Sequence, residues 1–331
     1  MNEEPTADSG AAVAPAVQLL RDRIAAGETI LIDGGTGTEI EALGVPMNSA
    51  AWCGLASLTH PDQVREVHEQ YLDAGAEMLI ANTYVCGRYI LMDAGHGDDF
   101  EMLNTRGIEL ALEARATRDA TDRVAVAGSI ATTLQGRSLR ELSEATIDYA
   151  DQAQVQAAAG AEFFTLEMMR DLDYTRAAID GVTKTGLPYW VGFSTEMRDG
   201  VPWLLEGTPE QGGTLAEGVQ MLSGVDYAPD VVAIMHTEVD DIDACLDVIQ
   251  AHWDGPVAVY AQTGRFERPH WIFTDTITPE AYADAALRWI DRGVQIVGGC
   301  CGISPSHIAH IHGRLTDFAA DHTHDEQSQG A

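Results

Sequence analysis

Short apolar runs alternate with longer stretches of helical periodicity along most of this chain. Each run holds four or five mainly apolar residues, and between the runs apolar residues recur at three- or four-residue spacing. Such runs predict buried strands, whereas the intervening periodicity predicts amphipathic helices. The eight predicted strands are residues 29–33, 77–81, 124–127, 163–166, 189–193, 231–235, 257–260 and 294–297.

A helix is predicted after every strand. The segments with helical spacing are 61–74, 98–118, 143–159, 172–184, 209–222, 240–250 and 279–292, and Ser304-Pro305 marks a helix start after the last strand. Strict alternation of strand and helix predicts a parallel sheet. Eight such units in 331 residues favour an α/β fold, a closed (β/α)8 or TIM barrel, over an open doubly wound sheet. No Gly-x-Gly-x-x-Gly motif follows the first strand, which counts against a dinucleotide site.

The barrel is expected to be a single domain spanning residues 16–318. The segment 1–15 is small, polar and rich in Ala and Pro, and the tail 319–331 is acidic and contains histidines. Both compositions predict disordered ends.

The charge of the chain is strongly negative. There are 52 acidic residues against 19 basic ones, a formal net charge of −33, and Lys184 is the one lysine. This balance predicts repulsion from nucleic acids and from anionic membranes, and it fits the solvated surface of a protein from a salty cytoplasm. No apolar run is long enough to cross a membrane, and the acidic start Met1 to Glu4 is unlike a signal peptide. We therefore expect a cytoplasmic protein whose partners are small molecules; a homo-oligomer stays open.

Polar residues follow every predicted strand. In a parallel barrel, functional groups gather at the carboxyl ends of the strands. Helix capping is the favoured role for Ser129 and Ser194. The residues at the strand ends are Asp33, Asn82, Ser129, Glu167, Ser194, His236, Gln262, and Cys300 with Cys301.

His236, Cys300 and Cys301 stand out among these residues as possible metal ligands. Five cysteines in a long chain argue against a disulfide framework, and a reduced cytoplasm suits thiolate ligands. Two cysteines and one histidine with an open fourth position are a known catalytic Zn²⁺ arrangement. The alternatives are cysteines that merely pack in a strained turn and a histidine that serves the core or caps a helix.

An open zinc position would ionise a substrate thiol, and the thiolate can attack a methyl group on a positively charged sulfur or nitrogen. Asp33 or Glu167 would anchor the amino group of such a substrate. Trp52, Tyr84 and Trp271 offer cation–π faces to an onium methyl donor, although each could equally pack at the rim.

Several motifs together resemble the homocysteine S-methyltransferase family. The likeness runs from about Thr29 to Leu315, and it is carried by the segments 298–302 and 304–308, the turn 33–38, and Asn82-Thr83-Tyr84. The resemblance implies that Cys300 and Cys301 bind zinc and that Asp33 and Glu167 hold the amino group of homocysteine. It also assigns the substrate site to the blocks that contain Trp52, Asn82, Thr83 and Tyr84.

One position departs from the family pattern. Where the family places its third zinc ligand, a cysteine preceded by asparagine, this chain has Met235-His236. Either His236 replaces the thiolate, or the zinc site is weakened or lost. Cys245, nine residues later on the next predicted helix, is not expected to substitute. The exchange leaves open whether the acceptor is homocysteine or another thiol or selenol.

The leading hypothesis is a zinc-dependent methyltransferase that forms methionine from homocysteine. The donor would be of the S-methylmethionine, S-adenosylmethionine or betaine type, with direct transfer because the chain has no room for a cobalamin module. Two alternatives stay open: a zinc-dependent barrel hydrolase that uses a metal-bound water, and a non-catalytic homologue that binds a thiol amino acid or metal.

Overall fold

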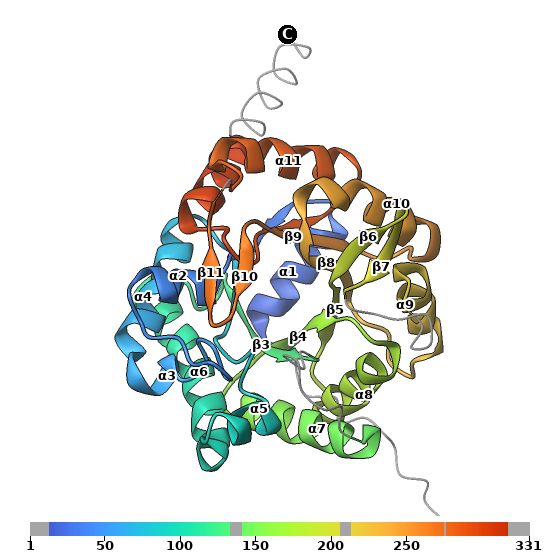
Figure 1. Ribbon diagram of the computed structural model, residues 1–331. Coiled ribbons are helices and arrows are strands. Elements are labelled where there is room, and N and C mark those ends of the chain that lie inside the picture. Colours follow the sequence, from blue (N-terminus) through green and yellow to red (C-terminus); the bar gives the residue numbers. More distant parts are fainter. Residues whose placement is uncertain (1–12, 133–140, 206–212, 275, 317–331) are drawn as a thin grey trace, which may run out of the picture.

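Eight parallel strands form one sheet that curves into a barrel (Figure 1). The computed structural model describes residues 13–132, 141–205, 213–274 and 276–316. Around the sheet the order is β1-β12-β9-β8-β5-β4-β3-β2. The strands are β1 (Ile30–Leu31), β2 (Met78–Ile80), β3 (Ala125–Ala131), β4 (Phe163–Met169), β5 (Tyr189–Phe193), β8 (Val231–Glu238), β9 (Val257–Gln262) and β12 (Ile296–Val297).

Backbone hydrogen bonds close the ring between the first two strands. The Glu77 N–H donates to the Leu31 carbonyl at 2.8 Å, and the Asp33 N–H donates to the Met78 carbonyl at 3.2 Å. Every predicted strand is present, and the (β/α)8 barrel expected from the sequence is confirmed. Because both faces of each strand are covered, the strands read as continuous apolar runs.

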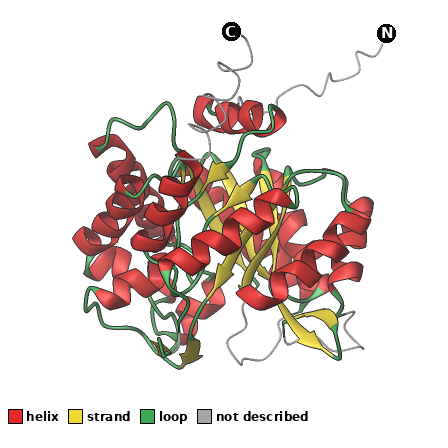
Figure 2. Cartoon of the chain, turned by 90° about the horizontal axis from the view of Figure 1, so that it is seen from above, coloured by secondary structure: helices red, strands yellow, loops and turns green. Residues whose placement is uncertain are grey.

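Helices surround the barrel, and the predicted ones lie where the periodicity places them (Figures 1 and 2). They are α4 (Pro61–Asp73), α6 (Phe100–Thr117), α7 (Leu142–Ala158), α8 (Leu172–Val182), α9 (Leu215–Met221), α10 (Ile242–His252), α11 (Pro279–Asp291) and the helical residues 305–316. Capping side chains begin several of them. The Thr214 hydroxyl accepts the Glu217 N–H while Glu217 bonds back to Thr214, a capping box that starts α9.

Two apolar layers hold the barrel together. The outer layer packs the helices against the sheet and includes Val64, Ala111 and Tyr282, all fully buried. The inner layer fills the barrel lumen; Phe163 and Trp190, for example, pack with tilted rings at a centroid distance of 5.2 Å. Side chains therefore fill the amino-terminal half of the lumen, and polar groups are left for the other end.

Helix α1 (Pro15–Ala25) lies across the amino-terminal end of the barrel, behind the strands in Figure 1. Its residues Ala16, Val17 and Leu20 join the lumen cluster, and Arg21 pairs with Asp230 at 2.6 Å. The sequence analysis assigned no helix here. The expected disordered segments 1–15 and 319–331 fall almost entirely outside the described residues.

Within the described residues, the loops also contain two antiparallel hairpins and three short helices that the sequence pattern does not predict. The hairpins are β6 (Thr195–Arg198) with β7 (Val201–Leu204), and β10 (Arg265–Glu267) with β11 (His270–Ile272); the helices are α2 (Thr36–Ala42), α3 (Ala56–Thr59) and α5 (Arg88–Asp93). Both hairpins follow the carboxyl end of a barrel strand. No helix within the described ranges is long and apolar enough to span a membrane.

Candidate active site

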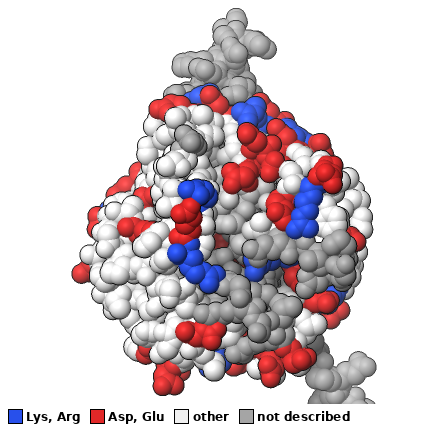
Figure 3. Space-filling view, in the orientation of Figure 1, with Lys and Arg blue, Asp and Glu red and all other residues white. Residues whose placement is uncertain are grey.

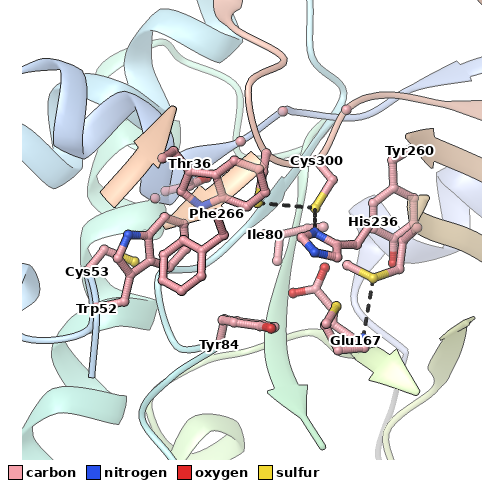
Figure 4. Close-up of a pocket in the computed structure, with 18 of the residues that line it drawn as sticks. Thr36, Trp52, Cys53, Ile80, Tyr84, Glu167, His236, Tyr260, Phe266 and Cys300 are labelled. Atoms are coloured by element: carbon pink, nitrogen blue, oxygen red, sulfur yellow. Dashed lines mark hydrogen bonds between the residues drawn. The ribbon is translucent and has the colours of Figure 1, made fainter. Parts of the chain in front are cut away.

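A cavity of about 450 Å³ opens at the carboxyl ends of the strands. Figure 4 shows the cavity. Some of the strand-end residues predicted from the sequence line it, but Asp33, Ser129, Ser194 and Gln262 are not among the lining residues. Trp52, Asn82, Tyr84, Glu167, His236, Cys300 and Cys301 all line it, together with Tyr260 and Phe266. Figure 3 shows basic side chains beside a hollow on this otherwise acidic face, and Arg170 and Arg268 are among the lining residues.

His236, Cys300 and Cys301 present one ligand atom each to a common point. The Cys300 Sγ lies 3.6 Å from the His236 Nδ1 and 3.8 Å from the Cys301 Sγ. All three atoms lie within 4.8 Å of one another. Tetrahedral Zn²⁺, with Zn–S near 2.3 Å and Zn–N near 2.0–2.1 Å, would separate two sulfurs by about 3.8 Å and sulfur from nitrogen by about 3.6 Å. The ligand types therefore fit zinc, and both distances from the Cys300 Sγ match tetrahedral coordination.

The two thiols of this cluster differ in acidity. Hydrogen bonds from Cys301 and His236 hold the pKa of the Cys300 thiol well below its ordinary value, in spite of burial. Burial and the neighbouring Cys300 charge raise the pKa of Cys301. Cys300 is therefore the more acidic thiol of the pair, which suits a metal ligand.

Glycines let the cysteine turn approach strand β1 closely. A Cβ on Gly298 would lie 2.2 Å from the Ile32 side chain, and one on Gly299 would lie 2.2 Å from Ile303. The Cys300 N–H donates to the Ala261 carbonyl at 2.8 Å, which ties the turn to β9. Larger residues at the glycine positions would push both thiols away from His236.

Backbone strain also concentrates at this cavity. Five non-glycine residues in the described ranges have positive φ, and three of them line the cavity: Trp52 (φ 39°), Met168 (φ 55°) and His236 (φ 46°). The strand pairing of β8 with β9 shifts register between Met235 and Glu238, where His236 stands. Such strain persists where the surrounding structure imposes it, and it tends to mark functional positions.

Asp33 and Glu167 are buried carboxyls on β1 and β4. The Asp33 Oδ2 accepts the Ile80 N–H at 2.7 Å, while its Oδ1 has no hydrogen-bond partner. Glu167 accepts a hydrogen bond from the Ser129 hydroxyl. The pKa of Glu167 is raised to about 8, mainly by burial and in smaller part by the Cys300 charge, while the hydrogen bond from Ser129 lowers it. Burial, with the Glu167 charge, raises the pKa of Asp33 well above its ordinary value.

Aromatic side chains form the wall opposite the carboxyls. The rings of Trp52 and Phe266 lie 6.3 Å apart edge to face, and Phe266 lies 5.7 Å from Trp271. The Trp271 ring in turn meets the His236 ring at 5.7 Å, also edge to face. The wall therefore reaches from Trp52, in the loop between α2 and α3, across hairpin β10–β11 to the histidine of the cluster.

Hydrogen bonds to Glu41 hold hairpin β10–β11 beside the cavity. The His270 Nδ1 lies 2.6 Å from the Glu41 Oε1, and the Trp271 N–H donates to the Glu41 Oε2 at 3.4 Å. Glu41 belongs to α2, so the aromatic wall is tied to both sides of the cavity mouth.

Comparison with known proteins decides the family. The family model described as homocysteine S-methyltransferase matches residues 30–315. This chain belongs to the homocysteine S-methyltransferase family. It is therefore an enzyme, a methyltransferase.

Individual relatives cover nearly the whole chain. Homocysteine S-methyltransferase 1 of Zea mays is 27% identical over 88% of this chain and 96% of its own length. Selenocysteine Se-methyltransferase of Brassica oleracea var. italica is also 27% identical, over 86% of this chain and 88% of its own. The metallated form of the Escherichia coli homocysteine methyltransferase MmuM shares the fold, with a TM-score of 0.73, 23% identity, and coverage of 91% and 99%.

Two residues assigned to the substrate site by family resemblance occupy different positions. Asn82 lines the cavity, and its amide donates to the Ser57 hydroxyl at 3.2 Å. Thr83 is fully buried behind it and does not line the cavity; its hydroxyl donates to the Ser129 carbonyl and accepts the Ser129 N–H, both at 3.0 Å. Thr83 thus joins β2 to β3 within the framework of this family member.

Of the remaining predictions, the one for Cys245 agrees with the structure and the one for Ser129 and Ser194 does not. Cys245 lies on α10 with its sulfur 3.1 Å from the Thr195 hydroxyl, outside the cluster, as expected. The capping role favoured for the two serines is wrong. The Ser129 hydroxyl bonds to Glu167, and the Ser194 hydroxyl lies between the sulfurs of Met168 and Met235.

Sequence reasoning also missed Phe266 and Tyr260 as lining residues. Phe266 stands in an aromatic-rich stretch, 265–273, that the pattern left as a loop, and this richness was the available signal. Tyr260 sits inside a predicted strand, where a tyrosine is indistinguishable from a core residue.

Proposed function

We propose that this methyltransferase moves a methyl group from a sulfonium or quaternary ammonium donor to the thiol of homocysteine, forming methionine. The observation that carries the proposal is the convergence of the His236, Cys300 and Cys301 ligand atoms, with both distances from Cys300 matching tetrahedral zinc. Three protein ligands leave a fourth position for the acceptor thiol. Bound zinc would supply the positive charge that keeps that thiol ionised at neutral pH.

The carboxyls provide the other end of the acceptor site. Asp33 and Glu167 lie in the same buried region as the cluster, since the Cys300 charge raises the pKa of both. A substrate ammonium would reverse the effect of burial and favour their ionised forms. The acceptor is thereby held by its amino group at one end and by its sulfur at the other.

The aromatic wall suits the donor. An onium methyl group carries partial positive charge, and the faces of Trp52, Phe266, Trp271 and Tyr84 offer it cation–π attraction without a bound anion. During transfer the acceptor sulfur forms a bond to the methyl carbon while the bond from that carbon to the onium atom breaks. The donor leaves as a neutral thioether or tertiary amine, and the thiol proton passes to solvent.

A different acceptor is the second candidate. The relatives from Zea mays and Brassica oleracea are equally similar to this chain, yet one is named for homocysteine and the other for selenocysteine. A selenol is ionised more readily than a thiol and needs less help from the metal. A site with histidine in place of the family cysteine is compatible with either acceptor.

Zinc content is the measurement that tests the metal site. Freshly purified reduced protein is expected to hold about one zinc per chain, and His236→Ala is expected to lose most of it, because two thiolates alone make an incomplete set. Cys245→Ser is the matched control: it removes a buried thiol outside the cluster and should keep the metal. Equal zinc in wild type and His236→Ala would remove His236 from the ligand set.

Methyl transfer is then measured directly. S-methylmethionine, S-adenosylmethionine and betaine are each offered with homocysteine and, in parallel, with selenocysteine. Product from homocysteine with at least one donor supports the proposal. Zinc-loaded protein that binds homocysteine but forms no product with any donor would instead favour the non-catalytic alternative.

A further inference from the structure

Tyr260 carries a hydroxyl that is buried and unpartnered at the floor of the cavity. The residue lies on β9 with 2% of its surface exposed, and its ring lines the cavity beside His236 (Figure 4). Its oxygen has no hydrogen-bond partner among the described residues. Buried hydroxyls nearly always have a partner, because leaving one unpaired costs stability. An unpaired hydroxyl beside a substrate cavity therefore points to a group that arrives with a ligand.

A glycine on a nearby strand makes room for this hydroxyl. A Cβ on Gly192 of β5 would lie 2.7 Å from the Tyr260 oxygen and 2.9 Å from the Met235 side chain. Strand β8 separates β9 from β5, so the phenol reaches across a full strand of the lumen. The pairing of Tyr260 with Gly192 directs the hydroxyl to the centre of the barrel.

A second unpaired oxygen lies beside the cavity, on Asp33, which directly precedes the lining residue Gly34 and whose carbonyl accepts the Gly299 N–H at 2.9 Å. The Asp33 Oδ1 is buried and has no partner, while its Oδ2 is engaged by the Ile80 N–H. After burial itself, the charges of Glu167, Cys300 and Asp33 raise the pKa of Tyr260, so the hydroxyl lies within the field of both carboxyls. It nevertheless forms no hydrogen bond with either one. Oxygens that share a space but do not bond to each other can be joined by a donor placed between them.

An ammonium group is the donor that fits. It carries three N–H bonds, and acceptor oxygens are offered by Asp33, which follows β1, by Glu167 on β4 and by Tyr260 on β9. We infer that the Tyr260 hydroxyl is the third acceptor for the α-ammonium group of the thiol amino acid substrate, alongside Asp33 and Glu167. The inference rests on the proposed function. It makes Tyr260 a substrate-binding residue and makes an acceptor with a free amino group a requirement of the site.

The charges of the site select the ammonium over the carboxylate of the same substrate. A carboxylate beside Tyr260 would meet Asp33 and Glu167, and repulsion between like charges would oppose it. A lone water molecule is the other possible partner of the hydroxyl. If the partner is the ammonium group, removing the Tyr260 hydroxyl weakens the binding of ligands that carry an amine. If the partner is a water molecule, it does not.

The test measures dissociation constants by calorimetry on zinc-loaded protein, without turnover. Three ligands are compared in wild type and Tyr260→Phe: homocysteine, 3-aminopropanethiol, which lacks the carboxylate, and 4-mercaptobutanoate, which lacks the amine. Tyr260→Phe is expected to weaken both amines by about tenfold or more, the worth of a hydrogen bond to a charged group, and to leave the acid unchanged. Tyr189→Phe is the matched control, because its hydroxyl bonds to the Tyr227 carbonyl and lies outside the cavity.

Each outcome is decisive. Equal weakening of all three ligands, or no change in any, overturns the inference and assigns the hydroxyl to a water molecule or to structure. Weakening of the two carboxylate ligands alone overturns it in favour of carboxylate binding. If Tyr260→Phe fails to fold, Gly192→Ala keeps the hydroxyl but displaces it, and the same selective loss of amine binding is expected. Wild-type protein that binds no homocysteine refutes the proposed function itself.

Discussion

At the scale of single residues, the site holds its carboxyls in a form that costs stability. Glu167 has 7% of its surface exposed and Asp33 none, and burial raises the pKa of each carboxyl. The folded protein therefore retains protons on these groups that the unfolded chain would release. Such residues are kept for binding rather than for folding.

The pH dependence of stability should reveal this cost at Glu167. Its pKa is about 8 in the folded protein against an ordinary 4.5. Between these values the folded state binds more protons than the unfolded state, so the Glu167 contribution to the free energy of unfolding falls as pH rises. Glu167→Gln, which cannot ionise, should gain stability relative to wild type from pH about 5 to pH about 8.

Urea unfolding of metal-free protein at both pH values measures the difference. Glu217→Gln is the control, because that exposed carboxyl has a lowered pKa and should show no such gain. A stability difference between Glu167→Gln and wild type that does not change with pH would contradict the prediction.

Residue types at strand ends could be predicted, whereas contacts across the lumen could not. His236, Cys300 and Asn82 were identified because each follows an apolar run, and parallel strands of a barrel bring such positions to one end. The close approach of the Tyr260 hydroxyl to Gly192 could not be predicted, because it depends on strand stagger and on which side chain faces inward. The sequence shows how apolar and polar residues alternate along one strand, but it does not show the register between neighbouring strands.

At the scale of elements, hairpin β10–β11 supplies half of the aromatic wall. Phe266 and Trp271 face the cavity from it, whereas Phe273 stacks on Trp271 at 6.1 Å and does not line the cavity. Phe266 and Phe273 are similarly exposed, at 40% and 44%. The two phenylalanines are therefore a matched pair that differs in position.

Removing the inner phenylalanine should affect the donor. Phe266→Ala is expected to raise the KM for the onium donor by about three- to thirtyfold, the range of one cation–π contact, with little change in the KM for the thiol. Phe273→Ala should leave both constants near wild type. Steady-state kinetics with each substrate varied in turn measures the effect. Equal effects of the two substitutions would assign Phe266 to hairpin stability instead.

The elements of the barrel were predictable because their signals are periodic and repeated eight times. Helices α4, α6, α7 and α8 begin and end within two residues of the predicted bounds. Helix α1 and hairpin β10–β11 were missed for a different reason. The hairpin strands hold three residues each and α1 stands outside the repeat, so their folding depends on contact with the barrel rather than on local pattern.

At the scale of the whole molecule, net charge dominates surface electrostatics. The chain carries −33, and many of its arginines already pair with acidic neighbours, as Arg118 does with Asp73 at 2.7 Å. Unpaired acidic groups repel one another in the folded state more than in the expanded chain. Red patches without blue neighbours are visible on the face in Figure 3.

Added salt should therefore stabilise the fold. Raising KCl from about 0.05 M to about 1 M shortens the screening length to about 3 Å and weakens this repulsion, so Tm should rise. If the exposed ion pairs dominated instead, screening would lower Tm. Differential scanning calorimetry at constant pH distinguishes the two, and a rise already complete at about 0.1 M would indicate a specific ion site rather than screening.

Strand β1 forms its ladder with β12, Ile30 with Ile296 and Leu31 with Val297, and single backbone hydrogen bonds join it to β2. On the ribosome, β1 therefore gains its ladder partner only after residues 296–297 have been made. The same late segment delivers Cys300 and Cys301. A chain halted before Val294 has neither the closing edge of the barrel nor two of the three proposed ligands. Synthesis thus orders the enzyme's assembly: barrel closure and the complete ligand set arrive together, once residues 294–301 have been made.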